Sequence, residues 1–296
     1  MGQKHVPIDD ALLARLPAPR TGHNAEEEAK PIAAKVVVAR KGSVPEVLEA
    51  LAAVAARDQR AESLRPLLLG AALVALAGAL WAFTSKTNVN LGFAAGGVAV
   101  TFFLARYLIG DNDVSDRQLA ATCTLLTTLA SELRAGEPVS MKINFSGWTR
   151  TFPRRSEGRK IYARDWLKLR LPLADGTQAS VAIRGVVKRK TRLLRKHVKH
   201  TDQLTERLTI TFTPPQGATF AIQTEPKVPR VAGLKLVRSE VKARRASFVF
   251  RTRVPLRRQR VHGGWALVKP GELLDGETLL SAFRQSHRAA KDATAG

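Results

Sequence analysis

Residues 66–83 read PLLLGAALVALAGALWAF, and after a connector of seven residues, residues 91–109 read LGFAAGGVAVTFFLARYLI. The first run has no charged residue, and the second has only Arg106. A helix needs about 20 apolar residues to cross a hydrocarbon core of roughly 30 Å. Trp81, Phe83 and Tyr107 lie near the ends of the runs, where aromatic belts meet the membrane interface. The two runs therefore predict a transmembrane helical hairpin over residues 64–110, and a pair of buried core helices is the alternative.

The short connector requires antiparallel helices, so both chain ends are expected on one side of the membrane. Basic residues near the membrane ends mark the cytoplasmic side, and five flank the outer ends of the hairpin against Lys86 in the connector: Arg57, Arg60, Arg65, Arg106 and Arg117. We expect a multi-pass membrane protein, of the bacterial inner membrane, with both termini cytoplasmic. The charged residues before the first run argue against a cleaved signal peptide. Small residues in both runs allow close helix packing and a possible homo-oligomer.

Helix signals flank the hairpin on both sides. Residues 1–42 are expected to form a mobile arm. Ser43 and Glu46 form a capping-box pattern that predicts an amphipathic pre-membrane helix over residues 43–63. Ser115 with Gln118 has the same pattern and predicts a linker helix within residues 114–136, on whose apolar face Cys123 is expected to be a small buried side chain. Asp275 is a candidate cap for a C-terminal helix within residues 271–296.

Between residues 137 and 270 the apolar period changes to two, which is typical of strands. In WLKLRLPL, residues 166–173, leucines alternate with charged or other residues, and Asp175 with Gly176 predicts a hairpin turn. A later run, residues 247–256, places Phe248 and Phe250 on one face and basic side chains on the other. The predicted fold is α+β: a two-helix transmembrane hairpin plus a mostly antiparallel, sandwich or barrel-like β domain with flanking helices.

The chain has 48 Lys and Arg against 25 Asp and Glu, a net charge of +23. Residues 137–270 contain 31 basic and 8 acidic side chains, so the entire excess lies in the predicted β domain. Two runs in it lack acids, with eight basic residues each: residues 184–199 and 242–260. Solvated loops are the alternative for one such run. Together with basic residues on the strands, the two runs predict an anion-binding surface made of Lys168, Arg170, Arg184, Lys188, Arg189, Lys190, Arg192, Arg195, Lys196, Lys199, Arg244, Arg245, Arg251, Arg253, Arg257, Arg258 and Arg260.

The position of this surface suggests its partner. A domain that follows two spans on the cytoplasmic side lies beside anionic lipids, which attract each nearby basic residue by about 1 kcal/mol. Nucleic acid is the competing partner, although few aromatic residues could stack on bases, among them Trp148, Trp166 and Trp265. We therefore expect a membrane-anchored, non-enzymatic protein that binds anionic phospholipid headgroups or another polyanion. The alternatives are a tethered nucleic-acid-binding protein, a scaffold that oligomerises through its spans and linker helix, and an enzyme with an unrecognised site.

Motifs for catalysis are weak. His197 and His200 have the spacing of a helical metal pair, but the surrounding lysines and arginines would repel a cation. Arg155 and Arg159 match one half of a cyclic-dinucleotide pattern whose second half is missing, and no phosphate-binding loop of the nucleotide-hydrolase type occurs. The expectation is no metal, no cofactor and no catalytic residue.

Overall fold

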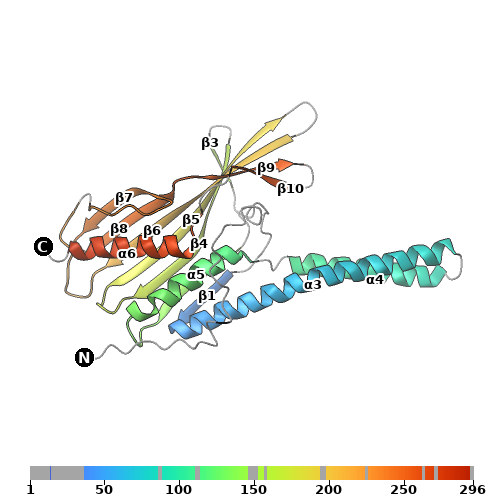
Figure 1. The fold of residues 1–296 in the computed structure, drawn as a ribbon, viewed down its shortest axis with the longest axis horizontal. Coiled ribbons are helices and arrows are strands. Elements are labelled where there is room, and N and C mark those ends of the chain that lie inside the picture. Colours follow the sequence, from blue (N-terminus) through green and yellow to red (C-terminus); the bar gives the residue numbers. More distant parts are fainter. Residues whose placement is uncertain are drawn as a thin grey trace.

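A computed structural model of the chain describes residues 14, 37–85, 89–110, 114–145, 153–156, 159–193, 198–223, 226–261, 264–269 and 273–293. It has an α+β fold in which an antiparallel sheet packs against helices, and a helical hairpin projects from one side of this domain (Figure 1). Two helices are long and apolar enough to cross a membrane.

These two helices are α3 (Val44–Thr84) and α4 (Val89–Gly110). The predicted pre-membrane helix and first span are one element, because α3 continues through Pro66 for 41 residues. Helix α3 begins after Ser43, whose backbone N–H donates to the Glu46 carboxylate at 3.3 Å, as the capping-box pattern predicts. In the most apolar windows of α3 and α4 the buried shares are 17% and 11%. Core helices would be mostly buried, so this exposure fits membrane spans better.

Small residues form the contact between α3 and α4. Ala72, Ala79 and Ala82 of α3 and Ala99 of α4 are buried. At Gly92, an added Cβ would come within 2.8 Å of the Phe83 ring, so the helices approach closely there. Such contacts are typical of helices packed in lipid, where small side chains let the backbones meet.

The sheet has ten strands, all in antiparallel pairs, and its main path runs β1-β2-β4-β5-β6-β8-β7. Its members are β1 (Val37–Gly42), β2 (Val139–Asn144), β3 (Arg154–Ser156), β4 (Arg159–Pro172), β5 (Gln178–Leu193), β6 (Val198–Thr213), β7 (Leu234–Lys242), β8 (Arg245–Thr252), β9 (Leu256–Val261) and β10 (Gly264–Lys269). Strand β3 pairs with β4, and the β9–β10 hairpin pairs through β9 with β6. Strand β1 lies within the segment that was expected to be a mobile arm.

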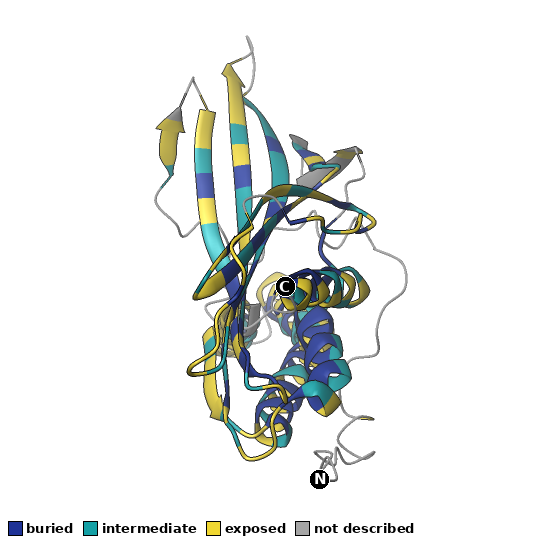
Figure 2. Cartoon of the chain, turned by 90° about the vertical axis from the view of Figure 1, so that its left-hand side faces the viewer, coloured by how far each residue is buried: buried dark blue, intermediate teal, exposed yellow. Residues whose placement is uncertain are grey.

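Helices, and no second sheet in the described residues, cover the buried face of this sheet. They are α5 (Asp116–Leu129), followed by the short helix η1 (Ala130–Glu132), α6 (Gly276–Asp292) and the first turns of α3. Figure 2 shows the sheet curving around them. Phe283 of α6 packs edge-on against Phe212 of β6 at 5.5 Å between ring centroids. The predicted sandwich or barrel is therefore replaced by one open sheet, because the apolar faces of α5 and α6 fill the place of a second sheet.

The first half of α3 joins the helical hairpin to the β domain. Val47, Leu48 and Leu51 are fully buried in the same core cluster as the sheet. Farther along α3, the buried Asp58 carboxylate accepts a hydrogen bond from the backbone N–H of Val114 at 3.0 Å, just before α5. Because α3 is one continuous helix, these contacts fix the direction in which the hairpin leaves the domain.

Candidate functional site

The predicted basic run over residues 184–199 forms the outer part of a long hairpin. Strands β5 and β6 pair without interruption from Gln178 opposite Thr213 to Leu193 opposite Val198. Strand β8 pairs with β6 only over residues 207–212, so the outer part of the hairpin extends beyond β8, and β9 pairs with β6 there over residues 201–204. Figure 1 shows this end of the sheet projecting together with β3 and the β9–β10 hairpin. We call this region, made of β3, residues 159–161, 186–193 and 198–204, and β9, the basic end.

Residues from distant parts of the sequence meet at the basic end. The register places Arg159 opposite Lys190, Lys160 opposite Arg189, and Arg192 opposite Lys199, while Arg155 of β3 lies opposite Lys160. Like charges directly opposite each other on antiparallel strands destabilise a sheet. An anion bound across the outer-face pairs, Arg159 with Lys190 and Arg192 with Lys199, would relieve that cost. Three of these cations, Arg155, Arg159 and Lys160, were not in the anion-binding set predicted from the sequence, where Arg155 and Arg159 were considered only as half of a cyclic-dinucleotide pattern.

The two faces of the basic end differ. Side chains on the outer face, opposite to the helices, are accessible, and those of Lys188, Lys190, Arg192 and Arg257 are exposed. No carboxylate among the described residues pairs with Lys188, Lys190 or Arg192. These side chains are therefore able to bind an external anion.

On the helix-facing side, Asp202 binds two of the predicted site residues. Its carboxylate accepts from Arg189 Nε at 2.8 Å and Nη2 at 2.9 Å, and Arg258 Nε lies 3.5 Å from Oδ2. Asp202 is 0% exposed and Arg258 is 1% exposed. The Arg189 guanidinium also lies over the Tyr162 ring at 5.8 Å. Arg258 is thus an internal residue that joins β9 to β6, and its side chain is not available at the surface.

The predicted residues Arg184 and Arg251 lie on the outer face nearer the centre of the sheet, together with Arg207 and Lys235, which were not predicted. A cross-strand row places Arg184, Arg207, Arg251 and Lys235 side by side on β5, β6, β8 and β7. Asp165 on β4 ends this row. It pairs with Arg184 and with Lys168 Nζ at 3.0 Å, and its pKa is lowered mainly by the hydrogen bond from Arg184. Arg170 is exposed on the same face.

A depression of about 310 Å³ opens beside Asp165. Its lining combines four basic side chains with one carboxylate: Lys142, Asn144, Ala163, Arg164, Asp165, Lys168 and Arg184. Arg164 donates from Nη2 to the Asn144 carbonyl at 2.9 Å, and burial lowers its pKa to about 10. Asp165 already neutralises Lys168 and Arg184 in part. This depression is therefore less suited to binding an anion than the basic end is.

Two further predicted residues, Arg244 and Arg245, are not brought to the basic end. Arg244 and Arg245 lie at the β7–β8 turn, and Arg253 follows β8. Because the turn is at the level of residue 213 and β6 is 16 residues long, roughly 50 Å of strand separates it from the hairpin tip. Arg195 and Lys196 lie outside the described residues, as do Trp148 and His197, and the side chain of Arg260 is not described.

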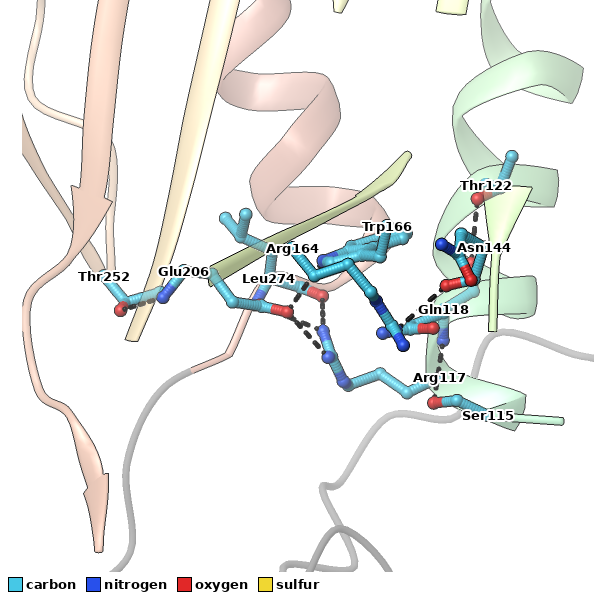
Figure 3. A network of polar contacts seen from close by, with 10 residues as sticks. All are labelled: Ser115, Arg117, Gln118, Thr122, Asn144, Arg164, Trp166, Glu206, Thr252 and Leu274. Carbon is cyan, nitrogen blue, oxygen red and sulfur yellow. Dashed lines mark hydrogen bonds and ion pairs between the residues drawn. The ribbon is translucent and has the colours of Figure 1, made fainter. Parts of the chain in front are cut away.

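A buried polar network lies where the basic end meets the helices (Figure 3). Glu206 of β6 accepts from Arg117 of α5 at 2.9 Å, from the Trp166 indole Nε1 at 3.0 Å and from the Leu274 backbone N–H at 2.7 Å. With a second Arg117 contact at 3.2 Å, both carboxylate oxygens are occupied. Glu206 thus links α5 and the segment just before α6 to the sheet. Trp166 is 2% exposed, so its indole ring is not available to stack on a base.

The single cysteine, Cys123, lies in the core of the β domain. Burial raises the pKa of the Cys123 thiol to about 12, so it is a neutral core side chain near pH 7. No three His, Cys, Asp or Glu residues group as metal ligands among the described residues. Comparison with protein-family models, with curated proteins and with solved structures found no match.

Proposed function

We propose that this protein is a membrane-anchored, non-enzymatic protein that binds anionic phospholipid headgroups through the basic end of its β domain. In this proposal α3 and α4 span the membrane with both termini in the cytoplasm. The observation that carries the proposal is that the basic end and the helical hairpin lie toward the same side of the domain (Figure 1). A bilayer that contains α3 and α4 would then face the basic end.

The joint between hairpin and domain supports this arrangement. A flexible linker would let the domain turn in any direction, whereas α3 is continuous from the domain core to the spans. The hydrogen bond from the Val114 backbone N–H to the Asp58 carboxylate also holds the segment just before α5 against α3. The orientation of the basic end toward the bilayer is therefore part of the fold in this proposal.

Charge supports a lipid partner. Each exposed basic residue near an anionic leaflet contributes about 1 kcal/mol of attraction, so Lys188, Lys190, Arg192 and Arg257 together would hold the end of the sheet at the headgroups. Nucleic acid remains an alternative outcome, but Trp166 is buried and unable to stack on bases. A scaffold that assembles through the spans, and an enzyme, are further alternatives.

Hydrogen–deuterium exchange of the full chain in nanodiscs tests the proposal. The backbone of residues 186–193 and 198–204 should exchange more slowly in discs with phosphatidylserine than in phosphatidylcholine discs, and the difference should vanish in 1 M salt, where the Debye length is about 3 Å. The double variant Lys188→Glu/Lys190→Glu should lose this protection.

A matched control reverses the same number of charges at the far end of the sheet, in Arg244→Glu/Arg245→Glu. This control should keep the lipid-dependent protection. Equal exchange in the two kinds of disc, or equal loss in both variants, would remove the support for lipid binding by the basic end. Protection by added RNA in place of lipid would favour the nucleic-acid alternative.

A further inference from the structure

A row of cations crosses the outer face of the sheet, away from the basic end. The register places Arg184 on β5, Arg207 on β6, Arg251 on β8 and Lys235 on β7 directly beside one another. All four side chains are exposed. We call these four residues the cation row. Because like charges opposite each other on antiparallel strands destabilise a sheet, an anion that lies on the row would stabilise the domain.

One end of the cation row already binds a carboxylate. Asp165 on β4 lies opposite Arg184 and accepts hydrogen bonds from its Nε and Nη2. This paired contact is the geometry in which arginine recognises carboxylates. No carboxylate among the described residues pairs with the other three cations, Arg207, Arg251 and Lys235. These three side chains are therefore able to bind acidic groups from outside the β domain.

The spacing of the three cations fits an acidic helix. Neighbouring strands lie about 4.8 Å apart, so Arg207, Arg251 and Lys235 span about 10 Å across the sheet. Acidic residues at positions i, i+4 and i+7 of a helix share one face and also span about 10 Å. Three residues on one face of an extended chain span about 13 Å. A helix that lies across the strands thus matches the row better than an extended peptide does.

Small neutral residues border the cation row on both sides. Ala182, Thr209 and Val249 lie side by side in the next row on the same face. On the other side of the row, Val186 lies opposite Thr205. These side chains are short compared with those of arginine and lysine. A helix is therefore able to approach the cation row closely.

The outer face is open to a soluble partner. Helices α5 and α6 lie in front of the sheet in Figure 1, and Figure 2, which looks along the helical hairpin, shows them on one side of the sheet. The outer face therefore points sideways from the hairpin. Single-stranded nucleic acid binds best where aromatic side chains stack on bases, and the exposed Trp, Phe and Tyr side chains of the described residues all lie on α3 and α4. An acidic helix of a protein is thus the better match.

We propose that the cation row docks an acidic helix of a partner protein. In this complex Asp or Glu side chains of the partner bind Arg207, Arg251 and Lys235 in the way that Asp165 binds Arg184. The site is separate from the basic end and does not depend on lipid binding. Because α3 and α4 hold the β domain at the membrane in the proposed function, such a partner would be recruited to the membrane surface.

Binding of designed helical peptides to the full chain in phosphatidylcholine nanodiscs tests this proposal. One stapled, alanine-based peptide carries Glu at positions i, i+4 and i+7, and a matched peptide of the same composition has its Glu residues distributed around the helix. Fluorescence anisotropy at low ionic strength should show tighter binding of the first peptide, and salt should weaken it. The Arg207→Glu/Arg251→Glu variant should lower this affinity by more than about tenfold, because two charge-assisted contacts are replaced by repulsion.

Thermal unfolding shows whether this variant is folded. The new carboxylates of Arg207→Glu/Arg251→Glu lie beside Arg184 and Lys235. Opposite charges on neighbouring strands are favourable, so the Tm should not fall. A loss of peptide binding at an unchanged or higher Tm therefore reports on the binding surface.

The matched control is Arg244→Glu/Arg245→Glu, which reverses the same number of charges at the β7–β8 turn and should keep the affinity for the first peptide. Equal binding of the two peptides, no binding of either, or an equal loss in both variants would overturn the proposal. Binding of an RNA oligonucleotide that only Arg207→Glu/Arg251→Glu removes, without peptide binding, would assign the cation row to nucleic acid.

Discussion

Arg257 and Arg258 are neighbours in the sequence and have opposite environments. Arg257 lies opposite Gln203 and is exposed on the outer face, while Arg258 lies opposite Asp202 and is 1% exposed. Side chains alternate between the faces of a strand, so a run of basic residues is divided between solvent and interior. Only the outward half of such a run is available to a partner.

Asp202 should be the most sensitive charged residue of the basic end. The Asp202→Asn variant removes the countercharge of Arg189 and Arg258, and breaking a buried ion pair in this way costs about 3–5 kcal/mol. We expect a clear fall in Tm, measured by thermal unfolding of the full chain in detergent. Glu240→Gln is the control, because Glu240 pairs with Arg238 and Lys242 at the surface and should leave the Tm unchanged. An unchanged Tm for Asp202→Asn would show that groups other than Asp202 balance the charges of Arg189 and Arg258.

His287 should make stability depend on pH near neutrality. Burial lowers its pKa from the ordinary value of 6.5, partly opposed by the Asp175 carboxylate 3.3 Å away. Its stacking on Phe212 at 5.2 Å places the ring against the core. A histidine with a lowered folded-state pKa binds protons more readily when unfolded, so its contribution is complete above about pH 6.5 and is lost as the pH falls.

The measurement is the difference in Tm between pH 7.5 and pH 5.5. The wild-type chain should lose more stability on acidification than the His287→Gln variant, which has no proton to gain at this position. A variant that loses as much as the wild type would assign the pH dependence to other groups.

At the scale of elements, the helical hairpin depends on small residues. Ala79 of α3 is 3% exposed, so Ala79→Leu forces three extra carbon atoms into the α3–α4 contact, and overpacking of this kind costs about 1–3 kcal/mol. We expect faster proteolysis of the connector in detergent. The control is Val74→Leu, which adds volume on the outer side of α3. Val74 is 75% exposed, so this change should leave the rate of proteolysis unchanged. Equal proteolysis of both variants would contradict the close packing.

Elements with strong local signals were predictable from the sequence. The capping residues Ser43 and Asp275, the leucine alternation of β4 and the turn at Gly176, whose φ is +82°, all appear in the structure. What the sequence could not show is which surfaces meet. The covering of the sheet by α5 and α6 depends on contacts between residues more than 100 positions apart, such as the bond of Arg117 with the Leu274 carbonyl. Strand β1 was missed because it pairs with β2 across about 100 residues.

The candidate site was predictable in composition and less so in shape. The sequence identified residues 184–199 as basic, and the register then brought Arg155, Arg159 and Lys160 beside them. No pattern in the sequence predicts this meeting, since it depends on β4 extending seven residues before Trp166. The second basic run is divided among the β7–β8 turn, the outer face and the basic end, because β8 and β9 separate at Pro255, which has no N–H to donate to a neighbouring strand.

At the scale of the whole molecule, the membrane topology is open to a direct experiment. With the spans as proposed, Ser85→Cys after α3 should react with a membrane-impermeant thiol reagent in intact cells. Arg244→Cys on the β domain should react only after the membrane is permeabilised. The Cys123→Ala background removes the native thiol. Labelling of position 244 in intact cells would place the β domain on the outer side and contradict the proposed topology.

The central claim is that the basic end contacts phospholipid in the protein's own membrane. A photo-crosslinking amino acid at position 190, with position 245 as the control at the far end of the sheet, reports the neighbour directly by mass spectrometry of the irradiated full-length protein. We predict phospholipid adducts at position 190 and none at position 245. Adducts of RNA or protein at position 190, or lipid adducts equally frequent at both positions, would contradict the claim.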